Sequence, residues 1–361
     1  MNKNFYITTP IYYPSAKPHM GHAYSSIVAD FFARFKRIDG FKVHFLTGTD
    51  EHGLKIQRAA ESKNIDPQIF CDEISQTFRN LSNTLNLSNT DFIRTTEDRH
   101  KKTVQYLWSQ LEKNGDIYLS KYSGWYSVSD EAFYTEEEIS EKEDNKIATS
   151  SGSLVEWIEE ESYFFRLSKW QDSLLEYYEN NPDFISPKSR KNEVISFVKS
   201  GLKDLSISRK AFSWGIKVPN NPEHVIYVWL DALTNYISAL NYPNTDDDLF
   251  KNFWPASVHL IGKDILRFHA VYWPAFLMAA KITLPNKIYG HGWILSGDEK
   301  MSKSKGNILD PIDIIETYGL DPLRYYLIKE VSFGNDGNIS QDRLEDCINS
   351  DLANNYGNLC Q

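Results

Sequence analysis

The 361-residue chain is long enough for two or three structural units, and its 41% of hydrophobic residues can fill a sizeable core. Its formal net charge of −10 argues against a protein that binds nucleic acid by electrostatics alone, although an acidic chain can still carry a local basic face. Its cysteines, Cys71, Cys347 and Cys360, are widely spaced without a C-x-x-C motif, which argues against a disulfide framework and a cysteine-based zinc site.

The chain shows no targeting or membrane-spanning pattern. Its N-terminus runs directly into a strand pattern, without the apolar segment of a secretory signal. The longest apolar run, residues 270–280, contains a proline and is too short to cross a bilayer. We therefore expect a soluble cytoplasmic protein that does not contact a membrane.

The first predicted elements are a strand at residues 5–7 and a helix at 23–37, joined by the stretch PHMGH at 18–22. A helix that begins after a strand offers backbone N–H groups and a positive dipole end to a phosphate. His19 and His22 are three residues apart and share one face of the first turn. Gly21 has no side chain, so a flat ring could approach the backbone there.

A second strand at 41–46 leads into the polar stretch 47–53, which completes a β-α-β unit. Residues 54–114 are predicted to be mostly helical, with helices at 53–62, 67–85 and 99–113. The pair Asn114-Gly115 ends the last of them.

From residue 116 the pattern changes to short aromatic-rich strands at 117–119, 124–128 and 155–158, followed by helices at 167–179 and 191–202. We interpret this region as a β-rich insertion. Residues 188–210 contain Lys188, Arg190, Lys191, Lys199, Lys203, Arg209 and Lys210 against only Glu193 and Asp204. This excess fits either an RNA-binding face or an ordinary solvated helix face.

Strand patterns return at 224–228, 257–261 and 287–293, alternating with helices at 229–240 and 265–280; further helices are predicted at 311–328 and 341–361. Together with residues 5–50, these strands predict one parallel sheet of a doubly wound α/β fold, split by the insertion. Ligands bind such sheets beyond the carboxyl ends of the strands. The stretches 19–22, 49–52, 262–264 and 290–293 all fall at such ends.

Seven stretches then follow one another in a recognisable order: TPIYY at 9–13, PHMGH at 18–22, GTDEHG at 48–53, VWLDAL at 228–233, IGKDI at 261–265, FH at 268–269 and KMSKS at 300–304. Together they resemble the methionyl-tRNA synthetases, a family of class I aminoacyl-tRNA synthetases whose HIGH and KMSKS motifs correspond to 19–22 and 300–304. The resemblance covers nearly the whole chain.

The resemblance implies a Rossmann-like catalytic domain in two halves, a stem-contact region and part of a helical bundle. The implied limits are 1–115 and 218–292 for the catalytic halves, 116–217 for the connective insertion, 293–340 for the KMSKS loop and stem-contact region, and 341–361 for the start of the anticodon-binding domain.

The implied reaction has two steps. The methionine carboxylate attacks the α-phosphorus of ATP to give methionyl-adenylate and pyrophosphate, and the terminal adenosine of tRNA(Met) then takes the methionyl group. Such chemistry requires positioning and charge stabilisation more than a protein nucleophile. The implied catalytic residues are His19, His22, Lys300 and Lys303. The implied contacts to ATP, with its Mg²⁺, are His19, Gly21, His22, Gly262, Asp264, His291, Gly292, Trp293, Lys300, Met301, Ser302 and Lys303.

The implied methionine pocket consists of Ile11, Tyr13, Asp50, Trp229, Ala232, Tyr236, Ile265, Phe268 and His269. Spacing alone would assign its aromatic members to core packing. Asp50 would pair with the ammonium of methionine, although a residue at this position could also cap the next helix. The Tyr236 hydroxyl and the Ile11 N–H would reach the sulfur and disfavour apolar competitors, which leave buried polar groups unpaired.

The sequence also departs from the family pattern. Residues 124–133 contain no cysteine where many members have a zinc knuckle, so we expect no structural zinc. The insertion is too short for a separate editing domain. Residues 348–359 resemble only the first helix of the anticodon-binding bundle, with Asn358 as a tRNA contact. We therefore expect a monomeric catalytic fragment that forms the adenylate without efficient tRNA charging.

Three alternative functions remain open at this point: another class I synthetase, a small-molecule nucleotidyltransferase that also uses an H-x-G-H motif, and a catalytically silent RNA-binding homologue. The short insertion argues against the first, the 300–304 motif against the second, and the presence of His19, His22 and Asp50 against the third.

Overall fold

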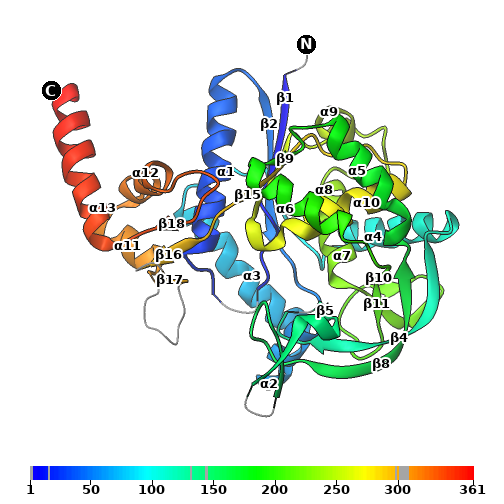
Figure 1. The fold of residues 1–361 in the computed structure, drawn as a ribbon. Helices are drawn as coiled ribbons and strands as arrows, with labels where there is room; N and C mark the ends of the chain where they lie inside the picture. The colour runs from blue at the N-terminus through cyan, green and yellow to red at the C-terminus, as the bar shows by residue number, and fades with distance from the viewer. Residues whose placement is uncertain (1–2, 15–16, 131, 143–144, 297–298, 301–308) are drawn as a thin grey trace.

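A six-stranded parallel sheet forms the centre of the molecule (Figure 1). The computed structural model describes residues 3–14, 17–130, 132–142, 145–296, 299–300 and 309–361. The strand order is β3-β2-β1-β14-β15-β9. The bounds are β1 Asn4–Thr8, β2 Lys42–Thr49, β3 Asp91–Arg94, β9 Ile185–Ser186, β14 Val258–Gly262 and β15 Ile288–His291. The predicted doubly wound α/β fold is thus confirmed.

Alternating side chains on the central strands divide the core into two clusters. In β1, Tyr6 packs into one cluster and Ile7 into the other, and both are fully buried. Leu46 and Phe45 of β2 divide in the same way, because successive side chains of a strand point to opposite faces. Both faces are therefore covered by helices, which explains why these strands read as apolar runs in the sequence.

Helix α1, Met20–Ile38, packs on one face of the sheet, whereas α4, Asp98–Lys113, and α10, Trp273–Ala279, pack on the other (Figure 1). Two other helices of the catalytic half are interrupted relative to their predictions. The predicted helix 229–240 is divided into α7, Val228–Leu233, and α8, Asn235–Ser238. The predicted helix 265–280 contains a π-helical turn at Phe268–Tyr272 before α10.

One predicted strand is wrong in its partner, and two strands of the central sheet, β3 and β9, were not predicted. The run 224–228 belongs to β13, Asn221–Ile226, which pairs antiparallel with β11, Ser208–Arg209, and β12, Lys217–Val218, outside the central sheet. The central sheet instead includes β3, which pairs with β2 and lies in a region predicted to be mostly helical. A short apolar run indicates a strand but not its partner.

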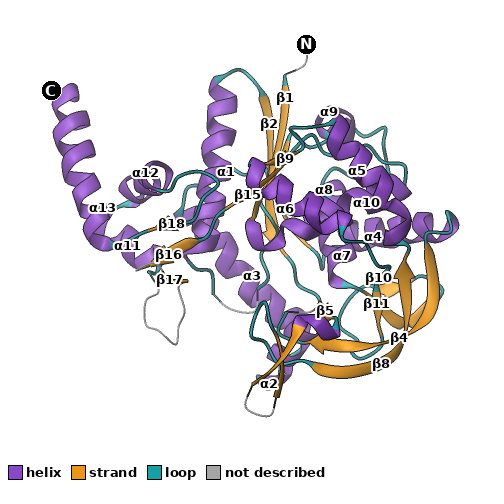
Figure 2. Cartoon of the chain, viewed as in Figure 1, coloured by secondary structure: helices purple, strands orange, loops and turns teal. Residues whose placement is uncertain are grey.

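The insertion forms a four-stranded antiparallel sheet, which lies apart from the central sheet (Figure 2). Its strands are β4 Ile117–Ser127, β5 Ala132–Tyr134, β8 Glu156–Phe165 and β10 Leu205–Ser206, and a separate hairpin joins β6 Ile139–Lys142 to β7 Asn145–Ala148. The two short strands predicted at 117–119 and 124–128 are one strand, because β4 pairs with β8 over its length. The chain then returns to the core, where β9 pairs with β15.

The basic stretch 188–210 does not form a continuous exposed face. Arg209 is only 2% exposed, and its guanidinium donates to Ser206 and Ser208. Lys210 is paired with Glu223 and Arg190 with Glu193. Arg209 therefore does not belong to an RNA-binding face, because its buried guanidinium is hydrogen-bonded within the protein.

The remaining elements include the helices that follow the central sheet. Gly319, with φ of +89°, divides the predicted helix 311–328 into α11 and α12. The remaining bounds are α2 Leu54–Ser62, α3 Pro67–Thr84, α5 Gln171–Asn180, α6 Lys188–Lys199, α9 Asp248–Phe253, α11 Pro311–Tyr318, α12 Leu320–Glu330, α13 Gln341–Cys347, α14 Asn358–Cys360, β16 Ile294–Ser296, β17 Glu299–Lys300 and β18 Gly337–Asn338, with a π-helical Ile348–Gly357 and 3₁₀ turns at Glu136–Glu138, Leu167–Trp170 and Lys263–Ile265. Within the described ranges, none of the helices has the length and apolar character needed to cross a membrane.

Candidate active site

A cavity of about 830 Å³ lies where β1, β2, β14 and β15 end and α1 begins. The predicted residues between Ile11 and Trp293 all line it except Phe268. Lys300 ends β17, whereas Met301, Ser302 and Lys303 lie outside the described residues. The stretches predicted to meet at the carboxyl ends of the strands are therefore brought together around one space.

The two histidines of the PHMGH stretch cap the first turn of α1. The backbone N–H of Gly21 donates to Nδ1 of His19, and the backbone N–H of His19 donates to Nδ1 of His22, each at 3.1 Å. A backbone N–H can only donate, so each Nδ1 is an acceptor and a neutral ring carries its proton on Nε2. Burial, together with the charge of nearby His19, lowers the pKa of His22 well below its ordinary range, so this ring stays neutral.

A neighbouring wall, which contacts α1, is formed by His291 and the residues after it. His291 donates from Nδ1 to the Gly292 carbonyl at 2.8 Å, so its Nε2 accepts from the Ser25 hydroxyl, also at 2.8 Å. At Gly292 an added Cβ would lie 2.1 Å from the backbone oxygen of Asn335. Only glycine therefore lets the two segments approach this closely.

Trp293 and Asp264 extend this wall. The Trp293 indole N–H donates to Asp264 Oδ1 at 3.3 Å, and its backbone N–H donates to Asp336 at 2.8 Å. Lys263 pairs with Asp336 at 2.7 Å and lies 4.1 Å from the centre of the Trp293 indole. At Gly262 an added Cβ would lie 2.6 Å from Asp264 Oδ1, so the glycine lets that carboxylate fold over the strand end.

Asp50 follows the last residue of β2 and is 8% exposed on the cavity wall. Its backbone N–H donates to the Tyr12 carbonyl at 2.9 Å, and Tyr13 donates from its hydroxyl to the His52 carbonyl at 3.1 Å. The alternative in which Asp50 caps the next helix is wrong, because Gly53 holds the N-cap position of α2. Asp50 thus lines the cavity at the end of β2 without capping the helix that follows.

Aromatic side chains from α7, α8 and the π-helical turn close the other side. The Trp229 and Phe268 rings stack at 3.5 Å with 5° between their planes. Trp229 lines the cavity while Phe268 packs against it, which explains why the predicted Phe268 does not reach the cavity. Such π-helical turns occur frequently at functional sites.

Tyr236, His269 and Ile265 form a chain of hydrogen bonds. His269 Nδ1 donates to the Ile265 carbonyl at 2.9 Å, so its Nε2 accepts from the Tyr236 hydroxyl at 2.7 Å. Burial lowers the pKa of His269 to about 4, so the ring stays neutral near pH 7. Behind it, the His259 ring stacks on Tyr236 at 4.0 Å.

Some cavity residues were not predicted from the sequence. They are Pro10, Tyr12, Lys17, Pro18, Tyr24, Ser25, Lys55, Ser129, Asp130, Val228, Leu233, Asn235, Ile294 and Asp310. Most are sequence neighbours of predicted residues, so proximity could have indicated them. Ser129 and Asp130 come from the insertion, and only the folded arrangement brings them to this cavity.

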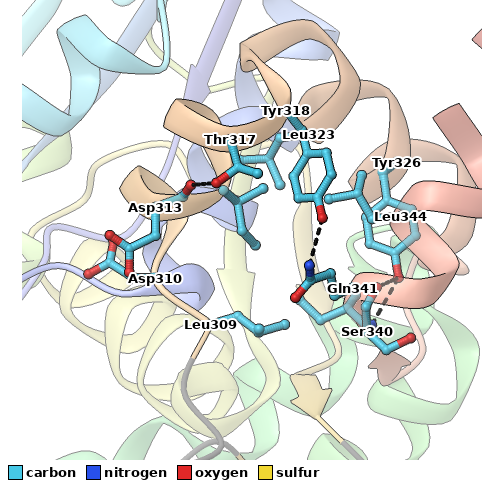
Figure 3. A pocket seen from close by; sticks show the side chains of 12 residues that line it. Leu309, Asp310, Asp313, Thr317, Tyr318, Leu323, Tyr326, Ser340, Gln341 and Leu344 are labelled. Atoms are coloured by element: carbon cyan, nitrogen blue, oxygen red, sulfur yellow. Dashed lines mark hydrogen bonds between the residues drawn. The ribbon is translucent and has the colours of Figure 1, made fainter.

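A second cavity of about 180 Å³ lies between α11, α12 and α13 (Figure 3). Its polar side chains bond to one another or to nearby backbone: Gln341 donates to the Tyr318 hydroxyl and Thr317 to the Asp313 carbonyl. It contains none of the predicted site residues. Asn358, the predicted tRNA contact, is exposed on α14 and lines neither cavity.

Comparison with known proteins is consistent across sequence and structure. Residues 5–361 match the family model described as tRNA synthetases class I (M). The chain is 60% identical to Methionine--tRNA ligase of Rickettsia bellii over its full length, which covers 70% of that relative, and 56% identical to Methionine--tRNA ligase 1 of Bacillus cereus, over 99% of this chain and 55% of that relative.

Solved structures agree with these sequences. The structure of Mycobacterium tuberculosis methionyl-tRNA synthetase bound by methionyl-adenylate superimposes with a TM-score of 0.97 at 52% identity, covering 99% of this chain and 71% of that one. Its apo form superimposes with a TM-score of 0.87 at 48% identity, over 100% of this chain and 68% of that one. From the family match, the relatives and these structures, the chain belongs to the methionine–tRNA ligases, a family of class I aminoacyl-tRNA synthetases.

Proposed function

We propose that the 830 Å³ cavity holds methionine and ATP side by side and joins them as methionyl-adenylate. The observation that carries this proposal is the convergence of the His19–His22 helix start, Asp50 and the Tyr236–His269 pair on one cavity. The ligase activates L-methionine with ATP and transfers the methionyl group to tRNA. The structural relative bound by methionyl-adenylate supports the first of these steps.

We propose that His19 and His22 act on ATP as hydrogen-bond donors. Their Nδ1 atoms accept from backbone N–H groups, so each ring carries a proton on Nε2, which would donate to phosphate oxygens. The start of α1 adds its dipole to the same side. Negative charge develops on these oxygens in the transition state, where fixed donors contribute most. Lys300 and Lys303, taken from the family resemblance, would neutralise the departing pyrophosphate.

The nucleotide would lie against the Gly262–Trp293 wall. Asp264 would hold the ribose, and His291, Gly292 and Trp293 would bracket the adenine. Among the described residues, no group of three or more histidine, cysteine or acidic side chains could hold a metal ion. Mg²⁺ would therefore enter as MgATP, with phosphate oxygens and water as its main ligands.

Methionine would lie across the Asp50 and aromatic walls. Asp50 would pair with the ammonium group, and the rings of Tyr13 and Trp229 would pack on the thioether, which is polarizable and contacts aromatic rings favourably. The Tyr236 hydroxyl donates to His269 in this structure. The Ile11 backbone N–H would then donate to the sulfur, and the Tyr236 oxygen would lie beside it.

We also propose the division of the chain that its family resemblance implies, with the connective insertion at 116–217 and the stem-contact region at 293–340. The tRNA substrate would be tRNA(Met), with Asn358 as one contact. The protein would act as a monomer, which size-exclusion chromatography with light scattering would check.

Methionine-dependent exchange of pyrophosphate into ATP tests the function directly. We expect exchange with L-methionine and no exchange with leucine, isoleucine or valine at equal concentration. Exchange with another amino acid, or none, would contradict the proposal and return the alternatives of another synthetase or a silent homologue.

A further inference from the structure

A buried carboxylate outside the cavity, that of Asp231, connects two of the cavity walls. Asp231 is fully buried in α7. Its Oδ2 is 2.7 Å from His52 Nδ1, and its Oδ1 is 2.7 Å from His100 Nε2. Neither the proposed ATP site nor the proposed methionine site uses any of these three side chains.

The first connection runs from Asp231 to the Asp50 wall. His52 follows Asp50 by two residues, and its carbonyl accepts the Tyr13 hydroxyl at 3.1 Å. The His52 ring also packs edge-on against Trp214, with ring centres 5.6 Å apart. The hydrogen bond to Asp231 therefore ties the loop that carries Asp50 to helix α7.

The second connection runs through His100 to α8. His100 is a fully buried residue of α4, and its Nδ1 lies 2.8 Å from the Ser238 hydroxyl. One imidazole thus bridges α7, through Asp231, to α8, through Ser238. Only Thr234, itself in the right-handed helical region, separates these two short helices. The bridge through His100 therefore adds a tertiary contact to the backbone link between Trp229 and Tyr236.

The side of α7 that faces the cavity differs from the side that carries Asp231. Val228, Trp229, Ala232 and Leu233 line the cavity, whereas Asp231 does not. Its carboxylate is instead bonded to His52 and His100. The carboxylate therefore acts on the cavity from behind, through the backbone of α7.

Each oxygen of the Asp231 carboxylate has one ring nitrogen as its partner. His52 Nδ1–H and His100 Nε2–H donate to the two carboxylate oxygens, and His100 Nδ1 accepts from Ser238. Because a buried ionic group adds little to stability compared with an apolar core, its retention calls for another role.

We propose that Asp231 is a positioning residue for methionine, which holds Asp50 and the α7–α8 aromatic wall at the separation that the amino acid requires. This inference rests on the proposed function of the cavity. It predicts a specific loss of methionine affinity, because none of the residues proposed to contact ATP takes part in the hydrogen bonds from Asp231 through His52 and His100.

The test compares Asp231→Asn with Asp116→Asn in the exchange assay. Asp116 is a matched control, since it is 2% exposed, accepts from Lys169 at 2.7 Å and lines neither cavity. We expect Asp231→Asn to raise KM for methionine about tenfold or more, because the groups that bind methionine are displaced. Its kcat and its KM for ATP should stay within about twofold of wild type. Asp116→Asn should leave all three within about twofold.

A second pair of variants covers the case in which Asp231→Asn does not fold. His100→Gln keeps an N–H donor near Asp231, whereas His100→Leu removes it. We expect the leucine variant to raise KM for methionine and the glutamine variant to restore most of the affinity. Equal KM values for methionine in both variants, or parallel rises in the KM values of methionine and ATP, would overturn the inference.

Pyrophosphate exchange by the wild-type protein distinguishes a failure of this inference from a failure of the proposed function. If the wild type fails to exchange pyrophosphate with methionine, the proposed function is wrong. If it exchanges normally while Asp231→Asn behaves like Asp116→Asn, only the positioning role is wrong.

Discussion

The backbone N–H of His19 donates to Nδ1 of His22 at 3.1 Å, and this bond confines the proton of the neutral His22 ring to Nε2. The hydrogen bond that caps α1 therefore also decides that His22, a cavity residue, carries its N–H donor at Nε2. The same contact explains why the two histidines are spaced three residues apart, because His22 must reach back to the N-cap residue.

Substitutions of His22 separate these two roles. His22→Asn keeps an acceptor for the His19 N–H but removes the Nε2–H donor. We expect kcat for pyrophosphate exchange to fall about 100-fold or more, as with loss of one transition-state donor. The melting temperature should change little. His22→Gln keeps a donor at the Nε2 position and should lose less activity. A kcat for His22→Asn within about threefold of wild type would contradict the role.

The Tyr236–His269 hydrogen bond provides a second prediction. Tyr236→Phe leaves His269 Nε2 without the hydroxyl that it now accepts from. We expect KM for methionine to rise about tenfold, the cost of an unpaired buried polar group, with KM for ATP unchanged. The preference for methionine over norleucine, which has CH₂ in place of sulfur, should shrink.

Tyr178→Phe is the matched control for this measurement. Tyr178 is also buried and donates its hydroxyl to a backbone carbonyl, that of Ala270 at 2.6 Å, but it does not line the cavity. We expect this variant to keep its methionine affinity. Equal effects of the two substitutions would show that the loss at Tyr236 is only a general packing defect.

Two glycines near the end of β15 should differ sharply in their tolerance of alanine. At Gly292 a Cβ would meet the Asn335 backbone oxygen at 2.1 Å, so the 335–336 segment must move. We expect Gly292→Ala to cost about 2 kcal/mol or more of unfolding free energy and to weaken ATP binding.

Gly290→Ala is the internal comparison, because the nearest atom to its new Cβ would be a Leu266 side-chain carbon at 3.5 Å, an ordinary contact. This variant should stay within about 1 kcal/mol of wild type. Urea unfolding and ATP titration of both variants check the pair. If Gly292→Ala were as stable and active as Gly290→Ala, the close approach at 292 would not matter.

Buried histidines should make the protein sensitive to mild acid. Burial lowers the pKa of His44 and of His269 to about 4, and lowers the pKa of His22, His259 and His291 below the ordinary 6.5. The unfolded chain therefore binds protons at a higher pH than the folded one. The unfolding free energy should fall as the pH drops below about 6.5, by up to about 1.4 kcal/mol per pH unit for each such histidine.

His44→Gln tests this dependence, because His44 lies outside the cavity and its Nε2 has no hydrogen-bond partner among the described residues. The drop in unfolding free energy between pH 7 and pH 5 should be smaller in this variant by about 1 to 2 kcal/mol. An unchanged drop would mean that His44 does not contribute. Asp30 affects the unfolding free energy only at lower pH. Burial by itself would raise its pKa, but hydrogen bonds from Ser88 and Arg34 outweigh burial and hold the pKa below 3.8.

The insertion is predicted to fold without zinc. The segment after β4 is held by the Asp130 carboxylate, which accepts from Tyr134 at 2.7 Å, from Ser153 at 2.8 Å and from Ser151. These bonds outweigh burial and keep the pKa of Asp130 low, so the contribution is present near pH 7 and is lost as the pH falls below 3.8.

We expect elemental analysis to find no stoichiometric zinc and a chelator to leave the melting temperature unchanged. Asp130→Ala should destabilise the protein by about 1 to 3 kcal/mol, because its charge-assisted hydrogen bonds are lost, and Asp130→Asn by less. Stoichiometric zinc, or a chelator effect as large as that of Asp130→Ala, would contradict this prediction.

Local patterns were sufficient to place most individual elements, and tertiary contacts explain the failures. The strands containing Tyr6 and Leu260 were predicted because continuous apolar runs indicate burial on both faces. The strand β3 was missed, since Asp91 and Arg94 are polar and its pairing with β2 is long-range. Residues 224–228 were recognised as a strand but assigned to the wrong sheet, because strand propensity carries no information about the partner.

The sequence by itself determined the fold class, the family and the motif residues at the strand ends, because the order and spacing of motifs survive without coordinates. Only the tertiary structure decided which ring nitrogen carries the proton in the cavity histidines. It also decided that Asp50 does not cap α2, that Phe268 packs behind Trp229, and that Asp231 connects two walls of the cavity. These depend on contacts between residues far apart in the chain, such as the 131 positions between His100 and Asp231. A local pattern cannot encode such a contact, since its energy exists only when the chain has folded.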